Sequence, residues 1–492
     1  MSGPDPSEGA GRRADRTTSG RSGRRAQVSR GAGALRSRLD VLVVLAVVLP
    51  LVVLASVAVI GEEQDHVPSA AAPEGAPLAD ATVICPASVS PGEGADVVAM
   101  RVPEVDGGEV TVRTGSARLR RPRTVDVPGP EPVALPRTDG LVALDATGDA
   151  ASGLVAGRRE ALVSEPCRAP AYDEWFLGLG GSARNGSTLT LVNPDDSAAV
   201  VDVNLIGPRG PIDEDAGRGI TIEGGRSVRV DLASVAPRRA DVAAHLSVSR
   251  GRVSMTVEHR YDPLGSGEAT VDTLPAQSRA ASRNLLLGVA PAGSQRSLYL
   301  ANPGDDEVRA TVRVMNADAV FTPSDTEDVV VPPRTQVRVP LAGIVDAQAA
   351  EGMLGLVVEA SGPVLSTVRG LDRGDLVAVG AAEVLRAPAA VVVPQGKARL
   401  VVGGARRAGV VRVRAYDAAG KVLLKNGRVE IGADRGASLA LPAGTAGITV
   451  EASATPVAAA VVVDSDGGTP GSAVVPVRPA DVTADVPVVR PR

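Results

Sequence analysis

The chain has 492 residues and a formal net charge of −5, with 44% hydrophobic and 22% charged residues, a composition that excludes wholesale disorder. One tryptophan, four tyrosines and two phenylalanines exclude an aromatic platform for nucleic acid as a main activity, and three histidines and two cysteines exclude most metal centres and nucleophilic triads. The 55 glycines and 38 prolines are typical of many short elements separated by turns.

Residues 41–60 are an uncharged, apolar run of twenty residues, long enough for a helix to cross the roughly 30 Å hydrocarbon core of a membrane. The segment 1–40 carries nine arginines against four acids, so the positive-inside rule places it in the cytoplasm and the rest of the chain outside. The same arginines could attract anionic lipid, but a topology signal needs them in any case. From residue 41 onward there are 43 basic and 53 acidic residues, a balance of −10 that argues against nucleic acid as a partner.

A cleaved signal peptide is the alternative interpretation of the apolar run. Ser56-Val57-Ala58 has the small residues of a cleavage site. The run exceeds the roughly 7–15 apolar residues of a signal peptide, however, and the segment before it is long. We therefore expect an uncleaved single-pass anchor, with the N-terminus cytoplasmic and the C-terminal region extracytoplasmic.

Cys85 and Cys167 enclose the first region expected to fold. Outside the membrane a pair of cysteines is most simply a disulfide, and closing a loop of about 82 residues stabilises by about 4–5 kcal/mol on the chain-entropy model. A redox-active pair is the weaker alternative, because the C-x-x-C spacing is missing. Within this region Gly140–Gly148 resembles Gly355–Gly362, which makes the region a candidate diverged copy of the repeat that follows.

An internal repeat of about one hundred residues occupies the rest of the chain. Leu189–Pro194 recurs as Leu298–Pro303, and Arg399–Gly404 is a third copy in which Gly-Gly replaces Asn-Pro. Each copy is followed by a period-two alternation of apolar and polar residues, which buries one face of a strand. Units of this length with short strands and frequent turns predict Ig-like β-sandwiches.

Two smaller predictions accompany the repeat. Turn residues near the end of each unit predict hairpins at Ser249–Val253, Val358–Val364 and Val450–Val457. A helical pattern is almost confined to Leu341–Ala350 and to the segment after Leu232, each sufficient for one or two turns.

The predicted fold class is all-β, with tandem β-sandwich repeats after a single N-terminal transmembrane helix. The predicted segments, in chain order, are a disordered Arg-rich cytoplasmic tail (1–40), a transmembrane helix (41–60), a Pro/Ala spacer (61–80), a disulfide-closed β domain (81–168), three β-sandwich repeats (169–277, 278–390 and 391–475) and a Pro/Val-rich tail (476–492).

Residues that could carry chemistry are few. His66, His245 and His259 accompany no nucleophile-elbow motif, so surface or structural histidines are preferred to a Ser-His-Asp site. Four acidic clusters invite a calcium hypothesis, but none matches the twelve-residue calcium loop, and such clusters are common in turns between strands. The clusters are Asp195-Asp196, Asp213-Glu214-Asp215, Asp305-Asp306 and Asp464-Ser465-Asp466-Gly467. We predict no cofactor, no metal and no catalytic residue.

Three of the seven aromatic residues lie together in the sequence, at Tyr172, Trp175 and Phe176. An exposed aromatic patch would mark a partner or glycan site. The alternative is that the three side chains fill the end of a sandwich core or its junction with the preceding domain, since aromatic residues usually go inside.

Several of these motifs together resemble a known family. The anchor, Cys85-Pro86, Pro166-Cys167, Trp175–Gly178 and Leu191–Pro194 are similar to an actinobacterial family of membrane-anchored exported proteins, catalogued as domain of unknown function 5719. The resemblance covers most of residues 81–475 and implies a cell-envelope setting in a high-GC bacterium, which the scarcity of lysine also suits. The family has no established catalytic residues, and the Gly403-Gly404 copy departs from its Asn-Pro pattern.

We therefore expect a non-enzymatic envelope protein, either a scaffold or a module that binds another exported or membrane protein. An envelope polysaccharide-binding module is the alternative and requires exposed aromatic side chains. An exported hydrolase that uses acids such as Asp213 or Asp215 is the weakest hypothesis, because paired carboxylates need a defined separation across a cleft.

Overall fold

A computed structural model of the chain separates Met1–Ala71 from a compact unit, Ala72–Arg492. It describes residues 48–52, 74–89, 96–160, 167–213, 215–290, 293–324, 326–345, 349–465 and 471–486. Residues 48–52 are helical and are the only part of the predicted anchor that is described; the Arg-rich tail lies outside the described residues. Within the described residues, no helix combines the length and the apolar character needed to cross a membrane.

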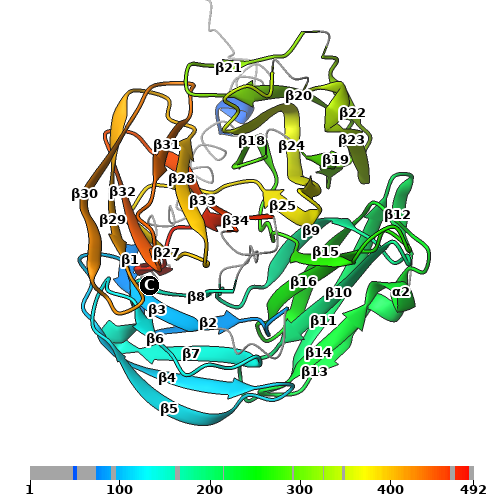
Figure 1. The fold of residues 1–492 in the computed structure, drawn as a ribbon. Coiled ribbons are helices and arrows are strands. Elements are labelled where there is room, and N and C mark those ends of the chain that lie inside the picture. Colours follow the sequence, from blue (N-terminus) through cyan, green and yellow to red (C-terminus); the bar gives the residue numbers. More distant parts are fainter. Residues whose placement is uncertain are drawn as a thin grey trace, which may run out of the picture. The chain divides into compact units, whose positions relative to one another are not determined.

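The unit Ala72–Arg492 is almost entirely β, in four successive sandwiches coloured from blue to red in Figure 1. The first sandwich contains β2 (Asp80–Cys85), β3 (Val97–Arg101), β4 (Gly108–Gly115), β5 (Arg120–Val127), β6 (Val133–Ala134), β7 (Leu141–Thr147) and β8 (Leu154–Arg158). The second contains β9 (Asp173–Leu179), β10 (Asn185–Val192), β11 (Ala199–Gly207), β12 (Gly210–Ile212), β13 (Ile220–Ile222), β14 (Ser227–Asp231), β15 (Val242–Arg250), β16 (Ser254–Tyr261) and β17 (Thr270–Thr273).

The third sandwich contains β18 (Ala281–Leu287), β19 (Ser294–Asn302), β20 (Val308–Met315), β21 (Val320–Phe321), β22 (Val329–Val331), β23 (Thr335–Pro340), β24 (Gly355–Asp372) and β25 (Asp375–Gly380). The fourth contains β26 (Val384–Leu385), β27 (Ala389–Val392), β28 (Lys397–Gly403), β29 (Gly409–Tyr416), β30 (Val422–Ile431), β31 (Ala437–Ala440), β32 (Gly447–Ser453), β33 (Val457–Asp464) and β34 (Ser472–Val477). In each sandwich, apolar side chains from both sheets form one shared core.

All four sandwiches share one strand order. We call the sheet that begins with the sandwich's first strand the leading sheet and the other sheet the trailing sheet. In the first sandwich the leading sheet has the order β2-β7-β4-β5, and the trailing sheet has the order β6-β3-β8. The fourth sandwich repeats this as β27-β32-β29-β30 and β31-β28-β33-β34, counted from β27, because the short strand β26 before it only adds a pairing to β33. The first strand therefore pairs with the sixth, whereas in the immunoglobulin order it pairs with the second. The prediction of sandwiches is confirmed, and the Ig-like pairing is corrected.

Residues 80–158 are thus a copy of the repeat. The segment Leu141–Thr147 forms β7, which pairs with β2 and β4 just as the first part of β24 pairs with β18 and β20. The sequence likeness of Gly140–Gly148 to Gly355–Gly362 therefore reflects equivalent strands.

The predicted hairpins do not form. Strands β15 and β16, and likewise β32 and β33, lie in different sheets, and β24 runs without interruption through Val358–Val364. The Gly and Ser signals mark the place where the chain crosses from the leading to the trailing sheet, which turn composition alone does not distinguish from a hairpin. The predicted short helices are present as α2 (Leu232–Val235), which is capped by the side chain of Asp231, and as the 3₁₀ turn η3 (Leu341–Gly343).

The leading sheet of each sandwich packs its outer face on the trailing sheet of the next, and the leading sheet of the fourth packs on the trailing sheet of the first. The four junctions therefore close a circle of contacts, as heterologous interfaces do in a ring. The apolar pairs are Ile84 with Val192, Leu177 with Tyr299, Leu287 with Val462, and Val392 with Met100.

The third copy of the turn motif is Gly-Gly because a junction passes over it. A Cβ atom at Gly403 would lie 2.8 Å from the Cε of Met315, and one at Gly404 would lie 2.9 Å from a methyl group of Leu285. Gly404 also has a φ of +78°, which favours glycine.

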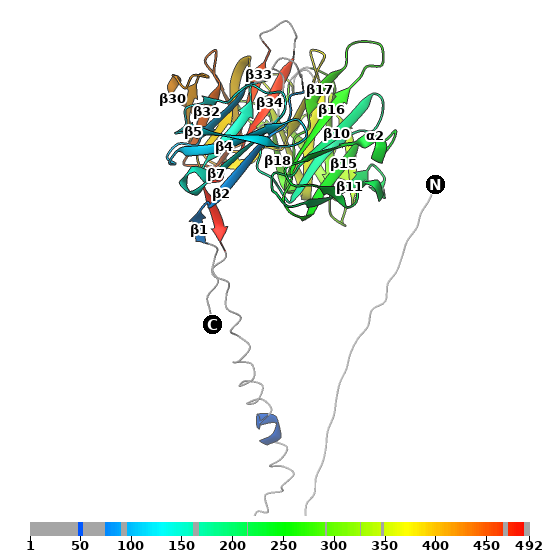
Figure 2. The same ribbon diagram turned by 90° about the horizontal axis from the view of Figure 1, so that it is seen from below.

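The two ends of the described unit pair with each other. Strand β1 (Glu74–Pro77) lies antiparallel to β35 (Thr483–Val486), and Figure 2 shows the two strands side by side. Both lie in segments that the sequence predicted as connecting regions, the spacer and the tail. Their pairing joins residues about 400 positions apart, a distance at which no local pattern predicts a partner.

Candidate functional site

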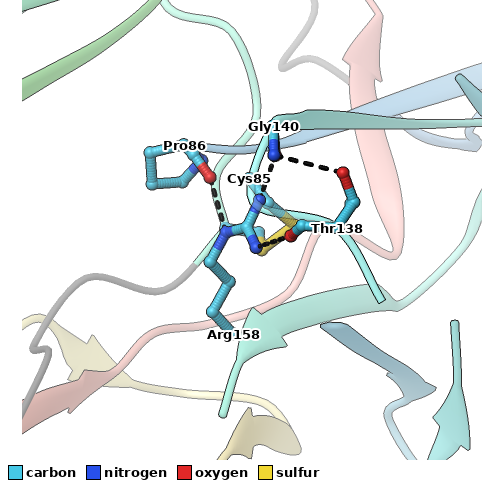
Figure 3. Close-up of a disulfide and its surroundings, with 6 residues drawn as sticks. Cys85, Pro86, Thr138, Gly140 and Arg158 are labelled. Carbon is cyan, nitrogen blue, oxygen red and sulfur yellow. Dashed lines mark hydrogen bonds between the residues drawn. A yellow bond between two sulfur atoms is a disulfide. The ribbon is translucent and has the colours of Figure 1, made fainter. Parts of the chain in front are cut away.

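Cys85 and Cys167 form the predicted disulfide inside the core of the first sandwich. Arg158 lies beside it and donates from Nε to the carbonyl oxygen of Pro86 at 2.6 Å, from Nη1 to that of Thr138 at 2.6 Å, and from Nη2 to that of Gly140 (Figure 3). Burial lowers the pKa of this guanidinium, against the opposing charges of Glu160 and Asp139. The disulfide thus lies in a buried setting beside Arg158, whose three guanidinium nitrogens each donate to a backbone carbonyl.

The three clustered aromatic residues do not form one patch. Tyr172, just before β9, is 64% exposed, Trp175 is partly buried, and Phe176 is 1% exposed within the core of the second sandwich. Because side chains alternate along β9, Glu174 and Phe176 turn to one side of the sheet and Trp175 to the other. Tyr172 and Trp175 consequently line two different openings.

The opening beside Trp175 is a groove of about 590 Å³ between the second and third sandwiches. Its floor is the outer face of the leading sheet β12-β11-β15-β9, and its wall comes from loops of the third sandwich. The lining includes Trp175, His245, Asn204, Ile212, Pro303 and Arg334.

Trp175 has a fixed position in this groove. Its indole stacks on the imidazole of His245, with ring centroids 4.3 Å apart and an interplanar angle of 10°. The Nε2 atom of His245 lies 2.7 Å from Oδ2 of Asp173. The carboxylate thus orients the imidazole, and the imidazole supports the indole.

The opening beside Tyr172 has a volume of about 480 Å³ and lies between the first, second and fourth sandwiches. Two arginines along it are already paired within the protein, Arg252 with Asp195 at 3.0 Å and Arg168 with Glu174 in a bidentate contact. A ligand here would have to compete with these existing ion pairs.

A buried polar cluster at the junction of the second and third sandwiches contains a Ser-His pair that resembles part of a catalytic triad. The Nδ1 atom of His259 lies 2.8 Å from Oγ of Ser187, and both residues are buried. Arg369 donates to Nε2 of the same imidazole at 2.8 Å, to the oxygen of Tyr299 at 2.7 Å and to the carbonyl of Gly178. A cation therefore stands where a catalytic triad has a carboxylate.

Hydrogen-bond directions prevent His259 from acting as a base towards Ser187. A guanidinium only donates, so Nε2 of His259 is an acceptor, and the single proton of the neutral imidazole is on Nδ1. Burial first, and then the charge of Arg369, hold the pKa of His259 well below its usual range, which keeps the ring neutral. His259 therefore donates to Ser187, whose oxygen also accepts from the backbone N–H of Gly180 at 3.1 Å.

Asn193 and Asn302 explain the repeated Asn-Pro motif. Each is almost fully buried where the second strand of its sandwich ends, and each donates from Nδ2 to the carbonyl that ends the fourth strand, Ile222 at 3.0 Å and Val331 at 3.1 Å. The motif is thus a structural turn.

In the first sandwich Arg101 takes the corresponding place. Its Nε donates to the carbonyl of Val127 at 2.7 Å, and its Nη1 bonds the carbonyls of Ala150 and Ser152. The replacement of a short amide by a long guanidinium explains why the sequence pattern is hard to recognise in this copy.

In each acidic cluster, one carboxylate forms an ion pair with an arginine. Asp195 pairs with Arg252, Asp305 with Arg334 at 2.6 Å, and Asp213 with Arg218 at 2.6 Å. In the fourth cluster Asp464 pairs with Arg373 at 2.7 Å. Across the part of the chain that the structure describes, no three metal-ligating side chains gather to hold an ion. His66, Asp466 and the side chain of Asp215 lie outside the described residues.

Arg369 and Tyr299, which form the centre of the buried cluster, were not predicted from the sequence. Arg369 is 110 positions from His259, so no local motif joins them. The glycines of Trp175–Gly181 were the available signal, because a Cβ at Gly178 would lie 3.2 Å from the ring of Tyr299, and its φ of +76° favours glycine.

Comparison with known proteins gives a family and no characterised relative. A model described as "Family of unknown function (DUF5719)" matches residues 123–442 and 292–490. The two matches overlap, as expected for a chain of tandem copies, because the same family model can be aligned to it starting at different copies. No curated protein and no solved structure matches the chain. The matches span about three quarters of the sequence, and the chain belongs to this family of unknown function, DUF5719.

Proposed function

We propose that this protein is a non-enzymatic recognition module of an actinobacterial cell envelope, held outside the membrane by its N-terminal anchor. The apolar run 41–60 and the arginines before it support the placement, and the Cys85–Cys167 disulfide suits an oxidising compartment. The partner is another exported or membrane protein, or an envelope glycan.

The observation that carries the proposal is the closed circle of junctions between the four sandwiches. Domains in a linear array usually move relative to one another, because their shared interfaces are small and polar. Here each sandwich is held by an apolar junction on two sides. Grooves at the junctions therefore keep a fixed geometry, which favours recognition because little order has to be created on binding.

The polar groups also favour recognition over hydrolysis. The hydroxyl of Ser187 and the imidazole of His259 are bonded to each other and to Arg369 inside a junction. Asp213 is a surface residue paired with Arg218, with side chains that are 84% and 60% exposed, so it lacks the enclosed setting that activates a carboxyl as an acid.

The test is affinity recovery of tagged full-length protein from native membranes after crosslinking, with a tagged segment 1–66 as the control. We expect a stoichiometric protein or glycan that is recovered with the full chain and not with the control. Recovery of the full chain alone under several crosslinking chemistries would contradict the proposal. Turnover of an envelope polymer by the purified protein would replace it with an enzymatic function.

A further inference from the structure

The groove beside Trp175 belongs to a type of site that recurs at a second junction. At the junction of the fourth and first sandwiches, a second groove of about 520 Å³ is lined in the same way, by the outer face of a leading sheet and by loops of the next sandwich. Pro103 and Glu104 form its wall, in the place that Pro303 has in the first groove. The two grooves therefore share a framework and differ in side chains.

The second groove is lined mainly by charged side chains, with four cations beside the acids Glu104 and Glu451. Arg412, Arg414, Lys425 and Arg428 line it, and no aromatic side chain does so. The aromatic lining of the first groove is accordingly not a consequence of the framework. It is a property of Trp175 and His245, and Trp175 is the only tryptophan in the chain.

The first groove combines apolar surface with paired charges. Ile206, Pro211, Ile212 and Pro303 provide apolar surface in the groove that Trp175 also lines. The charged groups in it are already neutralised by partners within the protein, Arg218 by Asp213 and Arg334 by Asp305. A ligand of high net charge gains little from such a lining.

The exposed polar groups of this groove can both donate and accept hydrogen bonds. The amide of Asn204 has one acceptor and two donors, the carboxylate of Asp213 accepts, and the guanidinium of Arg334 donates. A sugar has the matching surface, since its hydroxyl groups donate and accept while the C–H face of its ring is apolar and packs on an indole.

From this arrangement we infer that the groove lined by Trp175, Asn204, Asp213, His245 and Arg334 binds a neutral oligosaccharide. This inference rests on the proposed recognition function and names its ligand class. Because His245 and Asp173 already hold the indole in place, binding requires little further ordering of the tryptophan. The sugar ring packs on the indole while the polar side chains around it bond to the hydroxyl groups.

The single tryptophan makes the test direct, because its emission reports on this groove alone. Purified full-length protein is titrated with short neutral oligosaccharides of glucan, mannan, galactan and arabinan, and with a proline-rich peptide as the competing ligand class, since such peptides dock on aromatic grooves. We expect a saturable change in emission with at least one oligosaccharide series and none with the peptide.

Two variants keep the tryptophan and remove groove contacts, Asn204→Ala and Arg334→Ala, and each is expected to weaken the sugar about tenfold or more. The matched control is Arg428→Ala in the second groove, because Arg428 and Arg334 are similarly exposed, at 63% and 59%, and each pairs with one acid. The control should bind like the unmodified protein.

Absence of binding across all four series, or equal affinity in both groove variants and the control, would overturn the inference. A response to the peptide alone would also overturn it, in favour of a protein ligand. These outcomes are separable from failure of the proposed function, because recovery of a protein partner from membranes would leave a recognition module whose ligand is not a sugar.

Discussion

Arg369 reaches from the third sandwich into the second and bonds three buried groups, the imidazole of His259, the hydroxyl of Tyr299 and the carbonyl of Gly178. A buried guanidinium of this kind leaves unpaired acceptors when it is removed, each costing about 1–3 kcal/mol. We predict that Arg369→Met lowers the free energy of unfolding by about 3 kcal/mol or more, measured by urea titration at pH 7. Arg338→Met is the control, because Arg338 lies at the same junction with 45% of its side chain exposed. Similar losses in the two variants would contradict the structural role of Arg369.

Asp375, which begins β25, is a carboxyl whose charge is costly to the folded state. Burial raises its pKa to about 6, although the hydroxyl of Thr270 donates to it at 2.7 Å. Its Oδ2 atom has no hydrogen-bond partner among the described residues. The folded pKa exceeds the unfolded one, so the stability from the bound proton is complete below about pH 4 and is lost as pH rises through 6.

Asp375→Asn is therefore expected to raise the melting temperature at pH 7, and the gain should vanish near pH 4. Because the group is partly exposed, we expect a gain on the order of 1 kcal/mol. The control is Asp328→Asn, since Asp328 also accepts from a threonine hydroxyl, Thr311 at 2.6 Å, but is exposed. A gain that is the same at both pH values would show that Asp375 does not titrate as described.

At the scale of the elements, the Asn-Pro turn joins the second strand of a sandwich to the end of its fourth. We predict that Asn193→Ala and Asn302→Ala each cost about 1–3 kcal/mol of unfolding free energy, because a buried carbonyl loses its donor. Asn426→Ala, at an exposed site on β30, should change stability by less than about 0.5 kcal/mol. Chemical denaturation measures the free energy of unfolding of the three variants. Equal losses in all three would contradict the structural role of the two buried asparagines.

The pairing of β1 with β35 is a second prediction at this scale. Ala76 and Ala484 are directly opposite in the register, so cysteines at both positions should crosslink under mild oxidation and shift the mobility of the chain in a non-reducing gel. A control with cysteines at Ala76 and Ala480 should not crosslink, since Ala480 lies outside β35. Equal crosslinking of the two pairs would mean that these segments meet without a fixed register.

The sequence predicted strands well and their partners poorly. Period-two alternation marks a strand such as β11 or β29, because each buries one face, but it does not say which strand lies beside it. The sequence therefore revealed three copies of a unit and a candidate for a fourth, whereas the crossovers at Gly251 and at Ser361 were mistaken for hairpins. The first copy was hard to recognise because Arg101, and not an asparagine, donates to the carbonyl that ends its fourth strand.

The candidate site was only partly predictable for the same reason. Trp175 was recognised by its rarity, and the disulfide by the isolation of its two cysteines. The stacking of Trp175 on His245 depends on register between β9 and β15, and the wall of the groove comes from another sandwich, around Pro303. These contacts are tertiary, and no local pattern contains them.

At the scale of the whole molecule, the closed circle makes each sandwich depend on two neighbours. The Cys85–Cys167 disulfide restrains the first sandwich, whose trailing sheet contacts the fourth and whose leading sheet contacts the second. By the loop-closure model, a link across 82 residues stabilises by about 4–5 kcal/mol. If the circle unfolds as one unit, removing the disulfide lowers the free energy of unfolding of all four sandwiches together and not of the first alone.

We therefore predict that Cys85→Ala with Cys167→Ala lowers the melting temperature of the whole unit in a single calorimetric transition. A chain of independent sandwiches would instead show one early transition for the first sandwich and unchanged transitions for the others, because each would unfold by its own free energy. Hydrogen exchange adds the local readout. If the sandwiches are coupled, β20 and β28, which lie far from the disulfide in sequence, should lose hydrogen-exchange protection together with β3. Loss of protection in β3 alone would show that the circle of junctions does not couple the sandwiches.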